Sequence, residues 1–276
     1  MDDLYTRIEE ARDVIAARAR LAPRVGMILG SGLSGLADEL EEATEIPYHE
    51  IPGIPASTAP GHRGELALGR LAGQPIVAMR GRLHFYEGYS MQEVTFPVRV
   101  MRALGCEVLL VTNAAGGLRA DWSVGDLMRI TDQIFLPGLA GFHPLRGEND
   151  DRLGPRFPAM VGAFDAELGR IARAVAAEQG TTLREGVYTM VSGSAFESGA
   201  ELRMCQVLGG DAVGMSTAPE VIVARHAGMR VLGISLITNL ALPDGAPANA
   251  EEVLVEAEAA KPKFSALLKG ILARLP

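Results

Sequence analysis

The sequence predicts an α/β fold in which a central sheet is covered by helices on both faces. Short, continuously apolar runs of strand length recur along the chain, as expected for strands that are buried on both sides. Segments with apolar residues at helical spacing alternate with these runs. Hydrophobic residues make up 48% and charged residues 22% of the 276 residues, which is the balance of an ordinary globular protein.

The expected elements begin with an amphipathic helix over 3–20, where apolar residues recur every three or four positions. An apolar run over 25–29 predicts the first strand, and the glycine-rich turn 30–35 leads into a helix near Leu36. Further strands are predicted at 75–79, 107–112, 127–135, 187–192 and 231–237, and further helices at 164–179, 199–208 and 249–273. The Pro- and Gly-rich stretches 51–64 and 137–158 are expected to form long loops. No repeat or linker divides the chain, so we expect one domain over 1–276.

Charge and cysteine content exclude several classes of protein. With 26 basic and 34 acidic residues the net charge is −8, which argues against a nucleic-acid surface. The acidic, amphipathic N-terminus is unlike a signal peptide, and no apolar run approaches the roughly 18 residues of a membrane span. Cys106 and Cys205 are too few for a disulfide framework and are expected to be buried thiols. We therefore expect a cytoplasmic protein without nucleic-acid or membrane partners.

The turn 30–35 has the pattern GxGxxG after a strand, which also occurs in dinucleotide-binding proteins. That interpretation needs an acidic residue at the end of a second strand about 20 residues later. The corresponding region, 48–53, contains a proline and is expected to be a loop. The pattern therefore favours an anion-binding turn, in which backbone N–H groups and the Ser31 hydroxyl face the anion, or a purely structural turn.

The segment 81–88 carries two cations and a phenol. If it is extended, Arg82, His84 and Tyr86 lie on one side. The planar guanidinium suits phosphate oxygens and the imidazole can bind them too, although the segment can also be a solvated edge. Upstream, His62 lies near glycines in a loop, where a role in the core is less expected.

Four more segments place polar or small residues at the ends of predicted strands, where open α/β sheets bind ligands. Small residues around Ala114 allow a ligand to approach the backbone, and Ser216 or Thr217 either binds that ligand or caps the next helix. Phe196 beside Glu197 suits a planar base, as does the Asn239 amide, unless these polar groups only satisfy loop backbone. The motifs HExxH, GxSxG and GxxxxGK[ST] are absent, so metal, acyl-serine and NTPase chemistry have no support.

Taken together, these segments resemble the trimeric purine nucleoside phosphorylases, in family order over nearly the whole chain. The matching stretches are 30–33, 57–62, 81–89, 95–99, 111–117, 149–152, 156–160, 213–216, 219–226 and 237–239. The resemblance implies a single α/β domain around a distorted mixed sheet, assembled as a homotrimer. It also implies cleavage of the N-glycosidic bond of purine nucleosides by inorganic phosphate, a co-substrate, with no cofactor or metal.

The resemblance assigns a role to each candidate residue. Phosphate would be held by Ser31, Arg82, His84, the Ala114 N–H and Ser216, with His62 closing over it. The ribose would lie against Tyr86 and Met215, and the purine against Phe196, with Glu197 and Asn239 on its polar edge. His84, Glu197 and Asn239 would take part in catalysis, and Phe157 would enter the site of a neighbouring subunit.

Asn239 predicts a preference for inosine and guanosine over adenosine, because an amide both donates and accepts hydrogen bonds. Two departures from the family pattern bear on this expectation. The loop 193–198 reads Gly-Ser-Ala-Phe-Glu-Ser where the family usually has Gly-Pro-Ser-Phe-Glu-Thr, and Ala250 stands where the family tends to have histidine. The second departure leaves open a phosphorylase of 5′-modified nucleosides. A nucleoside-binding protein without turnover and a dinucleotide-dependent oxidoreductase are two competing hypotheses for the function.

Overall fold

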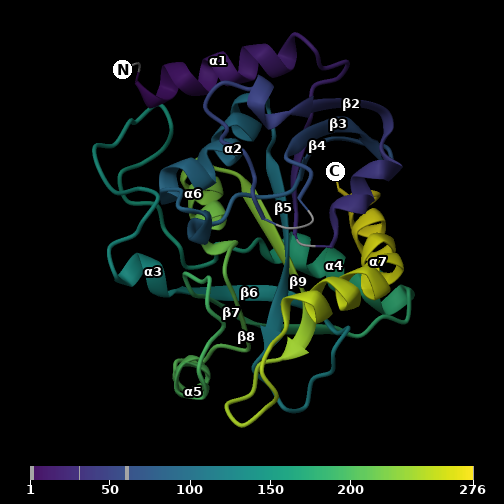
Figure 1. The fold of residues 1–276 in the computed structure, drawn as a ribbon. Coiled ribbons are helices and arrows are strands. Elements are labelled where there is room, and N and C mark those ends of the chain that lie inside the picture. The colour runs from purple at the N-terminus through teal and green to yellow at the C-terminus, as the bar shows by residue number, and fades with distance from the viewer. Residues whose placement is uncertain (1–2, 31, 60–61, 276) are drawn as a thin grey trace.

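The computed structural model describes residues 3–30, 32–59 and 62–275. Within these residues, nine strands form one mixed sheet in the order β2-β3-β4-β1-β5-β8-β7-β6-β9 (Figure 1). The strands are β1 (Val25–Leu29), β2 (Glu41–Pro47), β3 (Glu65–Leu71), β4 (Gln74–Arg80), β5 (Val108–Gly117), β6 (Leu127–Phe135), β7 (Leu183–Met190), β8 (Ala212–Gly214) and β9 (Arg230–Leu240).

The second half of the sheet closes on itself. β9 pairs in parallel with β5, from Val108 opposite Arg230 onward, and antiparallel with β6. The strands β5, β8, β7, β6 and β9 therefore form a closed ring, while β1 to β4 extend from β5 as an open sheet. The register of the β5–β9 pair shifts between Ala115 and Gly116, which distorts the ring where β5 ends. The distorted mixed sheet predicted from the family resemblance is confirmed.

Helices cover both faces of the open sheet, as predicted (Figure 1). The helices are α1 (Leu4–Ala16), α2 (Met91–Ala103), α3 (Leu136–Leu139), α4 (Ala166–Glu178), α5 (Gly199–Val207), α6 (Ala218–His226) and α7 (Ala250–Leu272), with 3-10 turns η1 (Ser34–Glu39), η2 (Tyr48–Glu50) and η3 (Phe85–Glu87). Ile28 packs with α1, α2 and α6, whereas its neighbours Met27 and Leu29 pack with α4, α7 and η1. No helix in the described part of the chain is long and apolar enough to cross a membrane.

The strand and helix predictions succeed where the apolar pattern is strong. β1 and β6 have the predicted bounds, and α4, α5 and α7 lie within the predicted helices. β2 is not predicted by its pattern, because this edge strand has an exposed first half beginning with Glu41 and Glu42. β3 and α2 are not predicted either. Pro97 in the middle of α2 indicates a helix break, although Ser90 and Glu93 form a capping box at its start.

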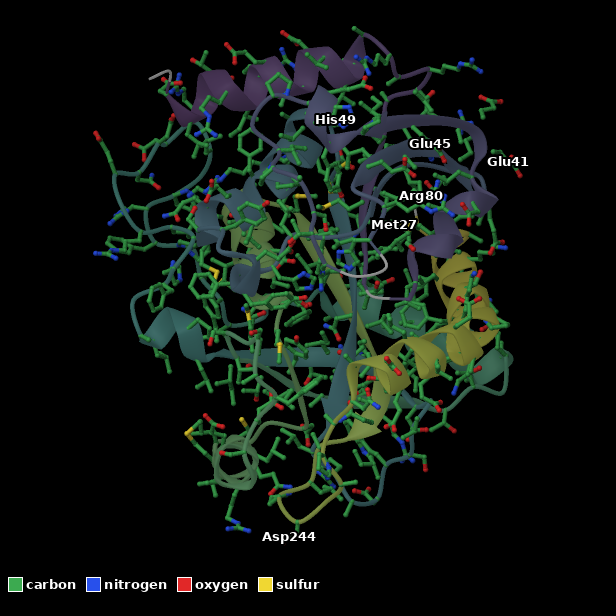
Figure 2. The ribbon with its side chains drawn as sticks, viewed as in Figure 1. Met27, Glu41, Glu45, His49, Arg80 and Asp244 are labelled. Carbon is green, nitrogen blue, oxygen red and sulfur yellow. The ribbon has the colours of Figure 1, made fainter. Side chains whose placement is uncertain are left out.

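A buried arginine fixes the end of β4, just before the segment that carries the candidate site. Arg80 is fully buried and pairs with Asp38, Glu45 and Glu65. Figure 2 shows Arg80 and Glu45 in the same part of the molecule. The carboxylates come from η1, β2 and β3, so a single guanidinium joins these elements. Next to it, Tyr48 Oη donates a hydrogen bond of 2.5 Å to the carbonyl of Gly81. The backbone that leads to Arg82 is therefore held on both sides.

Candidate active site

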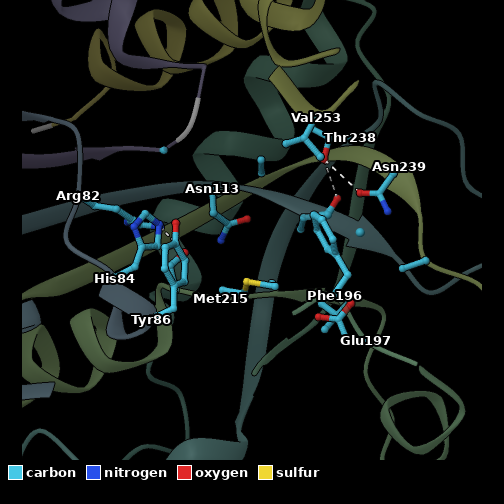
Figure 3. Close-up of a pocket in the computed structure, with 18 residues that line it drawn as sticks. Arg82, His84, Tyr86, Asn113, Phe196, Glu197, Met215, Thr238, Asn239 and Val253 are labelled. Atoms are coloured by element: carbon cyan, nitrogen blue, oxygen red, sulfur yellow. Dashed lines mark hydrogen bonds between the residues drawn. The ribbon is translucent and has the colours of Figure 1, made fainter. Parts of the chain in front are cut away.

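A pocket lies at the carboxyl ends of β5 and β9, between the segment that follows β4 and the loop before α5 (Figure 3). Nine of the predicted site residues line it: Arg82, His84, Tyr86, Ala114, Phe196, Glu197, Met215, Ser216 and Asn239. Figure 3 shows Arg82, His84 and Tyr86 at one end and Phe196 and Glu197 at the other, with Met215 between them. Residues more than 150 positions apart thus face one space.

Arg82 is the centre of the first end of the pocket. Its side chain is 2% exposed, its Nη1 donates to Ser216 Oγ at 2.5 Å, and its Nε lies 3.3 Å from Glu220 Oε1. Its Nη2 is buried without a hydrogen-bond partner among the described residues. A buried donor without a partner is costly, so this guanidinium is arranged to bind an acceptor that enters the pocket.

Ser216 and Thr217 do not cap α6, so the capping interpretation is wrong. Thr217 stands at the N-cap position with φ of +78°, an uncommon conformation for a β-branched residue, and its side chain makes no capping hydrogen bond. Its Oγ1 instead accepts from Arg82 Nη1 at 3.1 Å and from Asn113 Nδ2 at 2.9 Å. The start of α6 therefore serves the pocket, because its hydroxyls hold Arg82 in place.

The segment after β4 is extended only as far as His84, because η3 begins at Phe85. His84 and Tyr86 therefore do not alternate along a strand as predicted, yet their rings stack at 4.7 Å and both line the pocket. The backbone N–H of His84 donates to Glu87 Oε1 at 2.7 Å, and its Nδ1 lies 3.2 Å from the same oxygen. Nδ1–H donates in that pair, so Nε2 is left as an acceptor in a neutral ring.

The charges of this pair follow from burial and hydrogen bonding. Burial lowers the pKa of His84, against the opposing effect of its hydrogen bond to Glu87. Burial alone would raise the pKa of Glu87, but hydrogen bonds from His84 and Thr58 together lower it to about 2. At neutral pH the structure thus places an ionised carboxylate behind a neutral imidazole, an arrangement that supports proton acceptance at Nε2.

His62 lies beside this pair rather than among the pocket-lining residues. Its ring stacks on His84 at 5.2 Å. Its Nδ1 lies 2.9 Å from the Arg82 carbonyl oxygen and 3.1 Å from the Arg82 backbone nitrogen, so it donates to the first in one tautomer and accepts from the second in the other. Burial, together with the positive charges that His84 and Arg82 can carry, lowers the pKa of His62 to about 4. Gly81 permits this approach, since a Cβ there would lie 2.6 Å from His62 Cβ.

The other end of the pocket is more open. Phe196 is 45% exposed, and burial raises the pKa of the half-buried Glu197. Asn239 Oδ1 accepts from Thr238 Oγ1 at 3.4 Å, and Figure 3 shows the Asn239 amide beside Thr238 at the wall of the pocket. This end offers one aromatic ring, one carboxyl group and one amide, which suits a planar heterocycle with polar edges.

Three predicted residues are not among those that line the pocket. Ser31 lies outside the described residues. Phe157 is 87% exposed and lies near His143 and Ile222, apart from the pocket of its own chain. His62 contacts the pocket-lining residues His84 and Arg82 from behind.

Sequence reasoning missed nine pocket-lining residues. They are small or apolar for the most part: Gly30, Asn113, Ala115, Gly116, Val213, Gly214, Thr238, Ala241 and Val253. Several of these residues lie inside the strand-end segments that the sequence analysis names as candidates. Their position at the end of a strand is therefore the sequence signal that could have identified them. Val253 is different, because it belongs to α7 and no polar residue marks it. Gly30 is required by packing, since a Cβ there would lie 2.8 Å from Asn113 Cα.

Comparison with known proteins identifies the family. The sequence pattern of the phosphorylase superfamily matches residues 24–273. The chain belongs to the phosphorylase superfamily. It is 51% identical over 268 residues to purine nucleoside phosphorylase 1 of Geobacillus stearothermophilus, covering 97% of each chain. Solved structures of a Schistosoma mansoni purine nucleoside phosphorylase with adenosine and with inosine both give a TM-score of 0.94, at 40% and 39% identity, covering 98% of this chain and 98% and 97% of theirs.

The superfamily match, together with the relatives named purine nucleoside phosphorylase, confirms the resemblance on which the residue roles depend. Among the residues that the structure describes, no group of three or more His, Cys, Asp or Glu side chains is placed to hold a metal ion. The polar groups of the pocket are instead donors and acceptors for an organic substrate and an oxyanion. The roles of the individual residues stay predictions.

Proposed function

We propose that the protein is a purine nucleoside phosphorylase that acts as one domain over residues 1–276. It transfers the pentose of a purine nucleoside to inorganic phosphate and releases the free base and pentose 1-phosphate. The supporting observation is one pocket with a buried, partly unpaired Arg82 at one end and Phe196 with Asn239 at the other. The relatives named for the same reaction and the related inosine complex agree with this arrangement.

Phosphate occupies the end that contains Arg82. Its ligands are Ser31, Arg82, His84, the Ala114 N–H and Ser216, with His62 closing over it. Arg82 Nη2 supplies a charged donor and the Ser216 hydroxyl supplies a neutral one. Nε2 of His84 accepts the proton of the phosphate O–H, because Nδ1 is committed to Glu87.

The bond that breaks joins C1′ of the pentose to N9 of the purine, and the bond that forms joins C1′ to a phosphate oxygen. As the first bond lengthens, the sugar gains oxocarbenium character and the purine gains negative charge. Phosphate held under the sugar faces the developing cation, while Asn239 stabilises the departing purine. Tyr86 and Met215 pack against the ribose, and Phe196 against the base. Glu197 binds the polar edge of the base, where burial raises the pKa of its carboxyl group.

The preferred substrates are inosine and guanosine. As the glycosidic bond breaks, N7 of the departing purine takes up a proton from solvent, and the Asn239 amide then accepts from N7–H and donates to O6. A 6-amino group is itself a donor and leaves the amide N–H unpaired. Related structures hold adenosine in one case and inosine in another, so the presence of a ligand in a related structure does not show which base is preferred. The preference is tested by comparing kcat/KM for inosine with kcat/KM for adenosine.

The proposed working form is a homotrimer in which Phe157 enters the neighbouring site. Its support is the side chain itself, which is 87% exposed although it is large and apolar. No metal or organic cofactor, nucleic acid or membrane takes part. Free, buried Cys106 and Cys205 support a cytoplasmic location.

A second candidate substrate class is 5′-modified purine nucleosides. Of the described residues of α7, Val253 alone lines the pocket, and Ala250 at the start of the helix is exposed. α7 thus presents the methyl groups of Val253 to the pocket. A polar side chain there would discriminate against a nucleoside with an apolar 5′-substituent, and methyl groups would not. The ratio of kcat/KM for 5′-methylthioinosine and inosine tests this candidate, and a ratio above one establishes it.

The deciding experiment incubates the purified protein with inosine, with and without inorganic phosphate. Hypoxanthine and ribose 1-phosphate should appear in equal amounts, and only with phosphate. Adenosine should give a lower kcat/KM than inosine. Hypoxanthine without phosphate would indicate hydrolysis, and inosine binding without product would indicate a binding protein; either result contradicts the proposal.

A further inference from the structure

A second cavity, of about 410 Å³, lies outside the pocket described above and shares no residue with it. Its walls come from α1, α2, the end of α6 and the segment 151–154. The lining side chains that carry a charge or a polar ring are Tyr5, Glu9, Arg99, Arg102, Asp151, Arg152 and His226. Three arginines thus face two carboxylates, although the chain as a whole carries a charge of −8.

Arg99 is the unusual member of this cavity. It belongs to α2 and is 8% exposed, yet no carboxylate among the described residues lies within ion-pair distance of it. Its one hydrogen bond within the described residues runs from Nη1 to His226 Nδ1 at 3.4 Å. Burial lowers the pKa of Arg99 to about 10, against the opposing effect of Asp150. A buried cation without a counter-ion is expensive, so the site favours an anion.

His226 does not supply the missing partner. Its Nδ1 accepts from Arg99, so the neutral ring carries its proton on Nε2, which donates to Asn149 Oδ1 at 3.3 Å. Burial and the neighbouring Arg99 charge lower the pKa of His226 to about 4, which keeps the ring neutral at physiological pH. Both ring nitrogens of His226 have a hydrogen-bond partner, whereas only one of the five N–H groups of the Arg99 guanidinium has one among the described residues.

Arg102 is a second arginine of this cavity that lies outside every ion pair of the described residues. Arg102 donates from Nε to the Ala227 carbonyl at 3.1 Å and from Nη1 to the Cys106 carbonyl at 3.3 Å, so it has no carboxylate partner among the described residues either. The nearby acidic groups are engaged elsewhere. Asp3 and Asp150 pair with Arg152, Glu9 pairs with Arg12, and Asp151 accepts from Asn149. Arg99 and Arg102 are therefore the two cations that remain for a ligand.

We propose that this cavity is a binding site for a phosphate group, held by Arg99 and Arg102. The planar guanidinium of Arg99 can bind two phosphate oxygens through its unused N–H groups. The cavity has more room than one phosphate ion needs, and the ring of Tyr5 lies at its edge, stacked under Arg152 at 4.1 Å. Both inorganic phosphate and a phosphate monoester therefore fit the chemistry.

An occupied site would also stabilise the segment that leads to Phe157. Asn149 Nδ2 donates to the Gly154 carbonyl at 3.0 Å, and Asn149 Oδ1 accepts from His226. Gly154 lies so close to α6 that a Cβ there would be 2.0 Å from the His226 carbonyl oxygen. An anion on Arg99 thus acts on the same network that shapes residues 149–154.

The test is equilibrium dialysis of the full chain against radiolabelled inorganic phosphate and, separately, against phenyl phosphate. Arg24→Met is the matched control, because Arg24 is an exposed arginine outside the cavity. For at least one of the two ligands, the wild type and Arg24→Met should each bind one equivalent more than Arg99→Met binds. Binding of inorganic phosphate identifies the free ion as a ligand, and binding of phenyl phosphate alone identifies a monoester. Equal stoichiometry in all three proteins for both ligands overturns the proposal.

Arg102→Met provides a second measurement in case Arg99→Met does not fold. Arg102 is exposed on its outer side, so its replacement should leave the fold intact. We expect the dissociation constant of the additional site to rise about tenfold, the size expected for one charge-assisted hydrogen bond. An unchanged constant overturns the proposal. Neither arginine touches the active-site pocket, so both variants should retain phosphorolysis of inosine.

Discussion

The two ends of the active-site pocket are built differently. At the phosphate end, Arg82 is 2% exposed and Ser216 is 7% exposed, and each is held by the other and by residues behind them. At the base end, Phe196 is 45% exposed and Asn239 has one side-chain contact, to Thr238. The first end is buried in the core, whereas the second is partly exposed, with Phe196 on a loop and Asn239 near the end of β9. Substitutions at the phosphate end should therefore change stability and catalysis together, whereas those at the base end should change activity and selectivity with little effect on stability.

The largest effect is expected for Arg82→Met. The variant loses the main charged donor to phosphate, so kcat/KM for phosphate should fall about 10²–10³-fold. It also leaves Glu220, which is 2% exposed, buried without its cation. The free energy of unfolding should fall by about 3 kcal/mol, as measured by urea denaturation.

The double variant Arg82→Met/Glu220→Gln separates these two effects. Removing the stranded carboxylate should recover most of the stability, while phosphorolysis stays low. Recovery of activity along with stability would show that Arg82 acts through folding and not through phosphate. If Arg82→Met loses activity but keeps its stability, then the phosphate end does not couple stability to catalysis, and the proposed difference between the two ends is wrong.

Asn239→Asp tests the base end. A carboxylate accepts but does not donate to O6, so kcat/KM for inosine should fall about 10–100-fold and the ratio of adenosine to inosine activity should rise. Because Asn239 is only partly buried, the free energy of unfolding should change by less than about 0.5 kcal/mol. Steady-state kinetics with both nucleosides and a urea titration provide the measurements. An unchanged ratio would remove Asn239 from the recognition of the 6-position.

Phe157→Ala tests whether the base end is completed by another subunit. The side chain is 87% exposed in its own chain, so its loss should not alter the stability of the monomer. If it enters a neighbouring pocket, KM for inosine should rise about tenfold while KM for phosphate stays unchanged. Val161→Ala is the matched control, because Val161 is 98% exposed on the same segment. Equal KM values in the two variants would exclude Phe157 from the site.

The same contrast explains what the sequence could predict. β1 was predicted with its bounds because its five side chains are apolar or glycine and are buried in an unbroken run, whereas only the first four residues of β6 are buried in this way. Arg82, His84 and Ser216 were found because charged and hydroxyl groups at strand ends indicate an anion site. Their arrangement was not found in detail, since η3 breaks the expected alternation and Thr217 is not a cap.

The residues that escaped prediction depend on long-range contacts. Glu220 lies behind Arg82 as its counter-ion, but in the sequence it is one acidic residue in the first turn of a helix. Arg80 joins three carboxylates from η1, β2 and β3, and two of these elements are distant from it in the chain. Val253 is an apolar residue of an amphipathic helix, and only the packing of α7 brings it to the pocket. Periodicity reports local structure and leaves such pairings undetermined.

The smallest predicted effect at neutral pH concerns His62, which acts on the pH dependence of stability at the phosphate end. Burial lowers the pKa of His62 to about 4, from an ordinary value near 6.5. Between these two values the unfolded chain binds a proton at this residue and the folded chain does not, so stability is full above about pH 6.5 and is lost as pH falls toward 4. His62 thus contributes a slope of up to about 1.4 kcal/mol per pH unit.

His62→Gln should make the free energy of unfolding less sensitive to pH between about 6.5 and 4, as measured by urea titrations at several pH values. The slope should decrease and not vanish, because the pKa of His226 is also lowered to about 4 and this residue remains in the variant. His49→Gln, which removes an exposed histidine, is the matched control. A slope in His62→Gln equal to that of the wild type would mean that His62 is protonated in the folded chain. The phosphate end would then carry one more positive charge than the burial of its side chains implies.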